Sequence, residues 1–189
     1  HGGRLVVLTF HRVRPGGDDA RVRAMRNLDA PVPDFRRLLA WMRDRYEPLA
    51  LRDWIGRDAP PARASFAVTF DDGWADNYAH AFPVLRELGI PATIFLATGA
   101  IEDRVPFWWQ MPGLTDADIE LLKRRPHRWI EAQLAEHPDV RKARAADFLT
   151  WDQVREMGQS GLIHFGAHGH RHALLDLLAR DEAAADVRQ

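Results

Sequence analysis

The chain has 189 residues, of which 46% are hydrophobic and 28% are charged, a balance typical of an ordinary soluble globular domain. Intrinsic disorder and collagen-like repetition are therefore excluded. The 26 basic and 27 acidic residues give a formal net charge of −1, so nothing in the overall charge favours nucleic acid or anionic lipid as a partner.

The chain contains no cysteine, which excludes disulfides, thiolate metal ligands and cysteine nucleophiles. Any metal must therefore be bound by histidine and carboxylate side chains. No apolar run approaches the roughly 18 residues that a membrane span needs, so no span is expected.

Four short apolar runs predict the strands of a parallel sheet. They cover residues 5–10, 65–70, 92–97 and 162–166. The first three are continuous runs without helical spacing, which is typical of strands buried on both faces of a parallel sheet.

Amphipathic segments separate these strands and predict helices. One begins at Pro33, one covers 75–88 with Gly89 as its C-cap, and one covers 151–159 with Thr150 as its N-cap and Trp151 facing inward. Residues from about 102 to 150 are expected to form a mainly helical insertion, with pieces near 116–124, 127–136 and 139–148. The final segment, about 173–189, is also expected to be helical.

The alternation of strands and helices predicts a parallel α/β architecture, either a barrel or a doubly wound sheet. In both architectures, chemistry occurs at the carboxyl ends of the strands. Three polar clusters follow predicted strands directly, namely Phe10-His11, Asp71-Asp72 and the histidines from His168 to His172.

Two of these clusters together predict a metal site. The i, i+4 spacing of His168 and His172 places both imidazoles on one side of a helical turn, close enough to share an ion. The third ligand must be an oxygen, and the Asp71-Asp72 pair supplies one carboxylate for the metal and one that is free to act as a general base. Two histidines and one carboxylate leave coordination positions open, as hydrolytic metal catalysis requires.

These residues also resemble a known family. Thr69-Phe70-Asp71-Asp72-Gly73 is similar to the first signature of the polysaccharide deacetylases (the NodB homology domain), and residues 168–172 match the second, a His-x-x-x-His. Further similarity covers residues 8–13, 81–95 and 149–152. The resemblance implies a parallel (β/α) distorted barrel, incomplete in this chain, in which residues 1–189 form the N-terminal part of the domain and 102–150 an insertion.

The resemblance further implies a role for each matching residue. Asp71 is the general base, while Asp72, His168 and His172 bind a divalent metal, usually zinc. The implied reaction removes an acetyl group from an N-acetylated sugar, or less often an O-acetylated one. The implied partner is a polysaccharide or oligosaccharide that contains N-acetylglucosamine.

The chain departs from the family pattern in two respects. The family's later motifs, which supply an arginine, an apolar acetyl pocket and a histidine acid, have no counterpart in these residues. A barrel that lacks the strands bearing these motifs has unpaired strand edges, and these edges are expected to favour self-association. In addition, Gly169 stands where the family usually has Ser or Thr, which removes a hydroxyl that could support the metal ligands.

Alternative interpretations remain open. The chain could be a catalytically silent, metal-holding fragment that binds glycans or serves in their assembly, or a different metal hydrolase. His11 is expected either to line the site or to be a structural histidine, and His170 is expected to be exposed. Trp108 and Trp109 could form a platform for a sugar ring, although packing of the insertion is the favoured interpretation.

Overall fold

The structure is a computed structural model that describes residues 3–189 except 17–28, 60, 105–106, 111–113 and 137–146. The chain divides into two compact units. The first comprises His1–Phe95 with Leu149–Gly166, and the second comprises Leu96–Phe148 with Ala167–Gln189.

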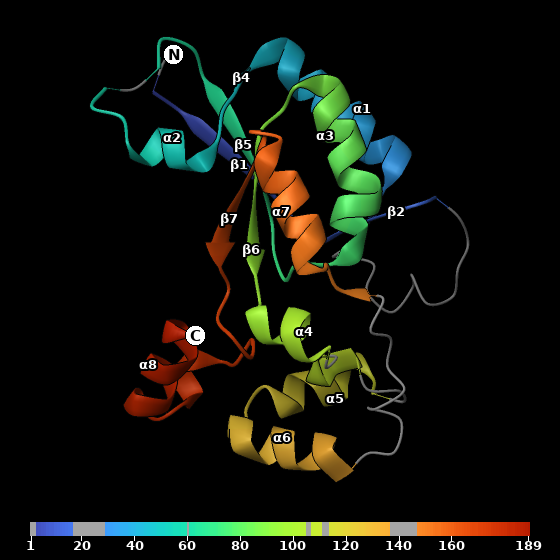
Figure 1. The fold of residues 1–189 in the computed structure, drawn as a ribbon, viewed down its shortest axis with the longest axis vertical. Coiled ribbons are helices and arrows are strands. Elements are labelled where there is room, and N and C mark those ends of the chain that lie inside the picture. Colours follow the sequence, from blue (N-terminus) through green and yellow to red (C-terminus); the bar gives the residue numbers. More distant parts are fainter. Residues whose placement is uncertain (1–2, 17–28, 60, 105–106, 111–113, 137–146) are drawn as a thin grey trace. The chain divides into compact units, whose positions relative to one another are not determined.

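The first unit is built on a parallel sheet with the strand order β1-β5-β6-β7 (Figure 1). These strands are Leu5–Phe10, Ser65–Phe70, Ala92–Leu96 and Ile163–Ala167, and a short strand β4, Glu47–Pro48, also pairs with β5. β1 and β5 are parallel and paired from Leu5↔Ser65 to Phe10↔Phe70. The predicted α/β class with parallel strands is confirmed.

Burial differs from the prediction in one strand of the sheet, β1. Every residue of β5 is buried, as the apolar run predicts. In β1, however, Val6 and Val7 are 39% and 45% exposed, so the prediction that this strand is buried on both faces is wrong. Among the described residues β1 ends the strand order, and its only neighbour is β5, which leaves one edge uncovered.

Three helical segments of the first unit, α1, α3 and α7, lie together on one side of the sheet (Figure 1). α1, Val32–Arg45, buries Phe35, Leu39 and Met42, which recur at helical spacing. α7, Trp151–Gln159, begins with a capping box in which Thr150 accepts from the backbone N–H of Gln153. The predicted start of α7 is confirmed.

The predicted helix over 75–88 is interrupted. A π-helical turn, η2, covers Asn77–Ala81, and α3 covers Phe82–Leu88 before ending at Gly89 in the left-handed conformation. Pro83 has no N–H to bond to the carbonyl of the preceding turn, and its ring crowds that carbonyl, which accounts for the widened turn.

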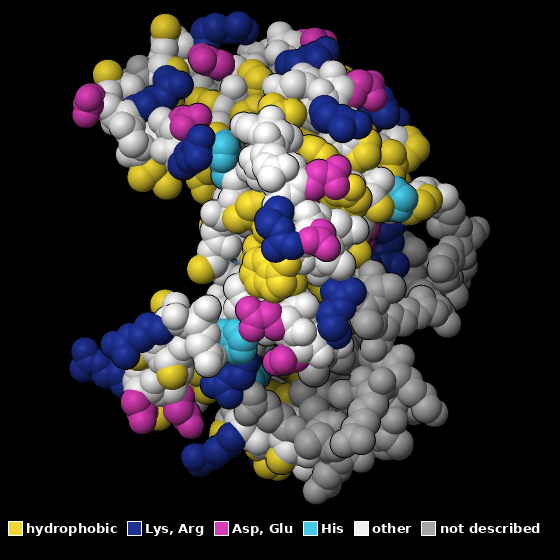
Figure 2. Space-filling view, in the orientation of Figure 1, with side chains coloured by type: hydrophobic (Ala, Val, Ile, Leu, Met, Phe, Trp, Pro, Cys, Tyr) yellow, Lys and Arg dark blue, Asp and Glu magenta, His cyan; other side chains and the backbone are white. Residues whose placement is uncertain are grey.

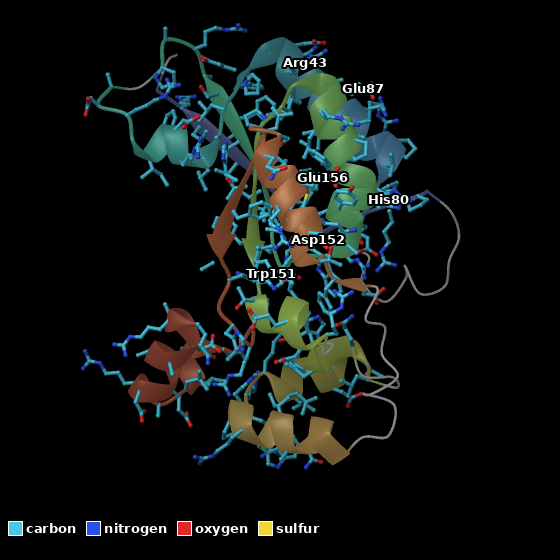
Figure 3. All side chains as sticks on the ribbon, viewed as in Figure 1. Arg43, His80, Glu87, Trp151, Asp152 and Glu156 are labelled. Carbon is cyan, nitrogen blue, oxygen red and sulfur yellow. The ribbon has the colours of Figure 1, made fainter. Side chains whose placement is uncertain are left out.

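Trp151 corrects another prediction. It is the first residue of α7 and is 36% exposed, so it does not face inward as expected (Figure 3). Glu156, also labelled in Figure 3, accepts a 2.7 Å hydrogen bond from the hydroxyl of Tyr78 in η2. α7 is therefore joined to the η2–α3 segment by a polar contact.

Besides β4, three short elements of the first unit have no counterpart in the sequence predictions. β2, Arg12–Arg14, pairs in parallel with β3, Asp29–Pro31, and α2 covers Leu51–Ile55. The paired β2 and β3 hold the chain that follows β1, which carries His11.

Apart from the ends of β6 and β7, the regular elements described for the second unit are helices. The unit contains α4 (Thr98–Asp103), η3 (Trp108–Gln110), α5 (Asp116–Leu122), α6 (His127–Glu136), η6 (Leu175–Leu177) and α8 (Arg180–Arg188). α5 and α6 match the pieces predicted near 116–124 and 127–136, whereas most of the piece at 139–148 lies outside the described residues. The predicted C-terminal helix is an α-helix only from Arg180 onward.

The described surface agrees with the near-neutral charge. On the face seen in Figure 2, basic and acidic side chains are interspersed over α1, α3 and α7. A search of the described residues finds no helix with the length and apolar character needed to cross a membrane.

Candidate metal and catalytic site

The carboxyl end of β5 presents two adjacent aspartates in different environments. Asp72, two residues after the end of β5, adopts a left-handed backbone conformation with φ 77°. Its side chain is buried, with the residue 3% exposed, whereas the Asp71 side chain is 21% exposed. The turn therefore separates a buried carboxylate, suited to a fixed ligand, from an accessible one, suited to proton transfer.

Asp72 is oriented by a chain of contacts inside the first unit. The indole N–H of Trp74 donates a 2.8 Å hydrogen bond to Oδ2 of Asp72. The guanidinium of Arg12 lies 4.2 Å from the centre of the Trp74 ring, a cation–π distance. Arg12 in turn forms a 2.6 Å ion pair with Asp76. This chain fixes the orientation of the Asp72 carboxylate.

Asp76 anchors that chain in the interior. Its Oδ1 accepts a 3.1 Å hydrogen bond from the backbone N–H of Val13. Burial raises the pKa of Asp76 above its ordinary value, and the Arg12 guanidinium acts in the opposite direction. Because Arg12 and Asp76 are both buried, removal of either partner leaves an uncompensated charge.

His11 lies beside Asp71. Its Nε2 is 3.8 Å from Oδ2 of Asp71, and both side chains are partly exposed. The amide of Asn77 donates a 2.9 Å hydrogen bond to the backbone carbonyl of His11, which holds this segment after β1. The structure thus places His11 next to the predicted base.

The two predicted histidine ligands lie in the second unit, on the loop that follows β7. Their ring centroids are 4.6 Å apart, so His168 and His172 do meet. The reason differs from the one predicted, because residues 168–174 form no helix. Gly169 and His172 adopt left-handed conformations, with φ 74° and 53°, and an α-helix cannot accommodate them.

Aromatic side chains surround His172. The rings of Phe107 and Trp109 lie 4.9 and 4.6 Å from the imidazole and are themselves stacked at 4.5 Å. Trp108, by contrast, is buried, with 4% of its surface exposed. Of the two predicted platform residues, only Trp109 is partly exposed, and its ring packs against a predicted metal ligand.

Asp72 in the first unit offers a carboxylate oxygen, and His168 and His172 in the second unit offer two imidazole nitrogens, which are the kinds of ligand atom that could hold a metal ion. Imidazole nitrogen and carboxylate oxygen are ligands that divalent cations such as zinc accept. A chain without cysteine must bind such a cation without thiolates. The sequence pattern contained no sign of Trp74, Arg12 and Asp76, whose contacts connect segments far apart in the chain.

Comparison with known proteins places the chain in a family. The sequence model described as Polysaccharide deacetylase matches residues 58–189. The chain belongs to this family, as the two signatures imply.

Individual relatives agree with this assignment. YxkH of Bacillus subtilis (strain 168) is 31% identical over 97 residues, which cover 49% of this chain and 32% of YxkH. The poly-beta-1,6-N-acetyl-D-glucosamine N-deacetylase of Escherichia coli (strain K12) is 23% identical over 172 residues, 89% of this chain and 21% of that protein. The chain therefore spans about a third or less of the length of these relatives.

The fold is also found in solved structures. The structure of the Streptococcus pyogenes deacetylase PplD in complex with acetate superimposes with a TM-score of 0.67 at 21% identity, covering 99% of this chain and 66% of that one. This likeness concerns the fold, and it supports the barrel type of α/β architecture.

Proposed function

We propose that the chain is part of a metal-dependent hydrolase that removes acetyl groups from an N-acetylated sugar polymer. The observation that carries the proposal is the pair of carboxylates at the end of β5, one buried and held by Trp74, the other accessible beside His11. General-base hydrolysis assisted by a metal needs these two roles on two residues.

We propose Asp72, His168 and His172 as the metal ligands and zinc as the cation. The burial of Asp72, the meeting of the two imidazole rings and the composition of the donor set support this assignment. A divalent cation held there would act as a Lewis acid on the acetyl carbonyl and as an activator of water.

Asp71 is the proposed general base. Its carboxylate is accessible and accepts the proton that the attacking water loses. Nε2 of His11 lies 3.8 Å from Oδ2 of Asp71, so the imidazole is a neighbour of the carboxylate proposed as the base. The proton then passes to the nitrogen of the departing amine, and acetate is released.

The proposed substrate is a polymer that contains N-acetylglucosamine. The name of the E. coli relative states that it acts on such a polymer. Within this chain, Trp109 is the proposed sugar-contacting aromatic residue, because Trp108 is buried and offers no face for stacking.

The test is acetate release from an N-acetylglucosamine oligomer, measured together with the zinc content of each sample. Wild type should release acetate, Asp72→Ala should lose zinc and activity together, and Asp71→Asn should keep zinc and lose turnover. Stoichiometric zinc without any acetate release, from each of several acylated oligosaccharides, would instead support the silent glycan-binding alternative.

A further inference from the structure

The loop that carries both histidines has no regular secondary structure of its own. Gly169 and His172 are in the left-handed region, and the loop forms no helix or strand between them. A residue other than glycine in this region is conformationally costly unless its surroundings hold it there. The contacts that hold this loop therefore decide where the imidazoles point.

One side of the loop is held by the start of α4. The backbone N–H of Gly99 donates a 2.8 Å hydrogen bond to the carbonyl of His170, and the N–H of Thr98 donates to the carbonyl of Gly169 at 3.3 Å. The Thr98 hydroxyl also lies 2.9 Å from Nδ1 of His170. His170 is thus half-buried and bonded, which corrects the expectation that it is exposed.

The other side is held by a single carboxylate from α8. The Asp186 side chain is fully buried. Its Oδ2 accepts from the backbone N–H of His170 at 3.1 Å, and its Oδ1 accepts from the N–H of Arg171 at 3.1 Å and from the Arg171 guanidinium at 3.2 Å. Three donors from the stretch between the two histidines converge on this one group.

The glycine at 169 fits the same arrangement. A Cβ at this position would lie 2.7 Å from Oδ2 of Asp186, closer than a Cβ and an oxygen can approach. The carboxylate therefore occupies the space in which a side chain at 169 would begin. Asp186 and Gly169 therefore pack against each other, although they are 17 residues apart in the sequence.

We infer that Asp186 is a positioning residue for the metal site, which holds the 168–172 loop so that His168 and His172 present their rings together. A buried carboxylate is expensive unless it is fully hydrogen-bonded, and all of the hydrogen bonds described for Asp186 go to this loop. The inference rests on the proposed function, because it assumes that the two histidines bind the metal.

The test compares zinc affinity, measured by calorimetry on the whole chain, among variants of two aspartates on the same helix. Asp186→Ala should weaken zinc binding about 10- to 100-fold, the usual cost of losing a residue that orients metal ligands. Asp186→Asn should have a smaller effect, since its amide oxygen can still accept from Arg171. Asp181 is exposed on α8, so Asp181→Ala and Asp181→Asn are the matched controls and should bind as wild type does.

A spectroscopic measurement separates positioning from simple loss of fold. The cobalt-substituted chain should show an altered ligand-field spectrum in Asp186→Asn while its far-ultraviolet circular dichroism matches that of wild type. Gly169→Ala should weaken zinc binding as well, and the double variant with Asp186→Ala should lose less affinity than the sum of the two single variants. The Cβ clash disappears with the carboxylate, whereas the strain of alanine at φ 74° remains.

The outcomes are distinct. A wild-type chain that binds no divalent metal would overturn the proposed metal site and this inference with it. Wild-type binding that is retained in full by a folded Asp186→Ala or Asp186→Asn variant would overturn the role of Asp186 alone. Additive effects of Gly169→Ala and Asp186→Ala would also contradict it.

Discussion

Replacement of Trp74 by phenylalanine removes the indole hydrogen bond to the proposed metal ligand and leaves a small cavity in the core. The indole N–H lies 2.8 Å from Oδ2 of the buried Asp72, while the ring also supports the Arg12 guanidinium at 4.2 Å. Phenylalanine keeps an aromatic face for Arg12, which stays paired with Asp76. The variant therefore tests the donor and not the whole chain of contacts.

The size of the effect follows from the type of bond. A hydrogen bond to a charged group contributes about 1.5–3 kcal/mol. Since about 1.4 kcal/mol corresponds to a tenfold change in a binding constant, zinc should bind roughly 10- to 140-fold more weakly to Trp74→Phe if the bond serves only the metal-competent orientation of Asp72.

The assay is a zinc titration by calorimetry with Trp151→Phe as the matched control. Trp151 is 36% exposed at the start of α7, so the same substitution there should leave zinc affinity unchanged. Denaturant unfolding of the zinc-free proteins measures separately the loss in free energy of unfolding that the smaller phenylalanine side chain causes by leaving a cavity. Equal zinc affinity in Trp74→Phe and Trp151→Phe would refute the claim that the indole orients Asp72.

Three further predictions concern the proposed base, the buried ion pair and pH. Asp71→Asn should reduce acetate release by about 10²- to 10⁴-fold with zinc still bound, and unchanged turnover would contradict its role as base. Asp76→Ala should lower the free energy of unfolding by about 3–5 kcal/mol because Arg12 is left buried and unpaired. Denaturant titration checks this against Asp152→Ala, which removes an exposed ion pair and should cost less than about 1 kcal/mol. Burial lowers the pKa of His164 from 6.5, so the unfolded chain binds that proton more readily, and the free energy of unfolding should fall as pH drops below 6.5. This pH dependence should weaken in His164→Gln.

The elements that the sequence predicts well are those decided by local chemistry. The buried run 65–70 and the Thr150 cap depend on neighbouring residues, and both are found as predicted. The exposure of Val6 and Val7 could not be predicted in this way, because it depends on the place of β1 in the strand order.

The same distinction between local patterns and long-range contacts applies to the candidate site. Asp71-Asp72 and the His168–His172 spacing are local patterns, and they are visible in the sequence. The residues that orient them are not, since Arg12 is 64 residues from Asp76 and Asp186 lies on a helix after the second signature. Even the histidine pair was predicted for the wrong reason, because i, i+4 spacing indicates a helical turn and the chain forms a glycine-containing loop.

The most direct test of the account is the dependence of acetate release on bound zinc. The chain is stripped of metal with a chelator, titrated with zinc, and assayed on an N-acetylglucosamine oligomer at each step. We expect activity to be absent without metal, to rise in proportion to bound zinc up to one equivalent, and to stay absent in Asp72→Ala at every point. Acetate release that persists in the metal-free chain, or that Asp72→Ala retains, would contradict a metal-dependent deacetylase built on these residues.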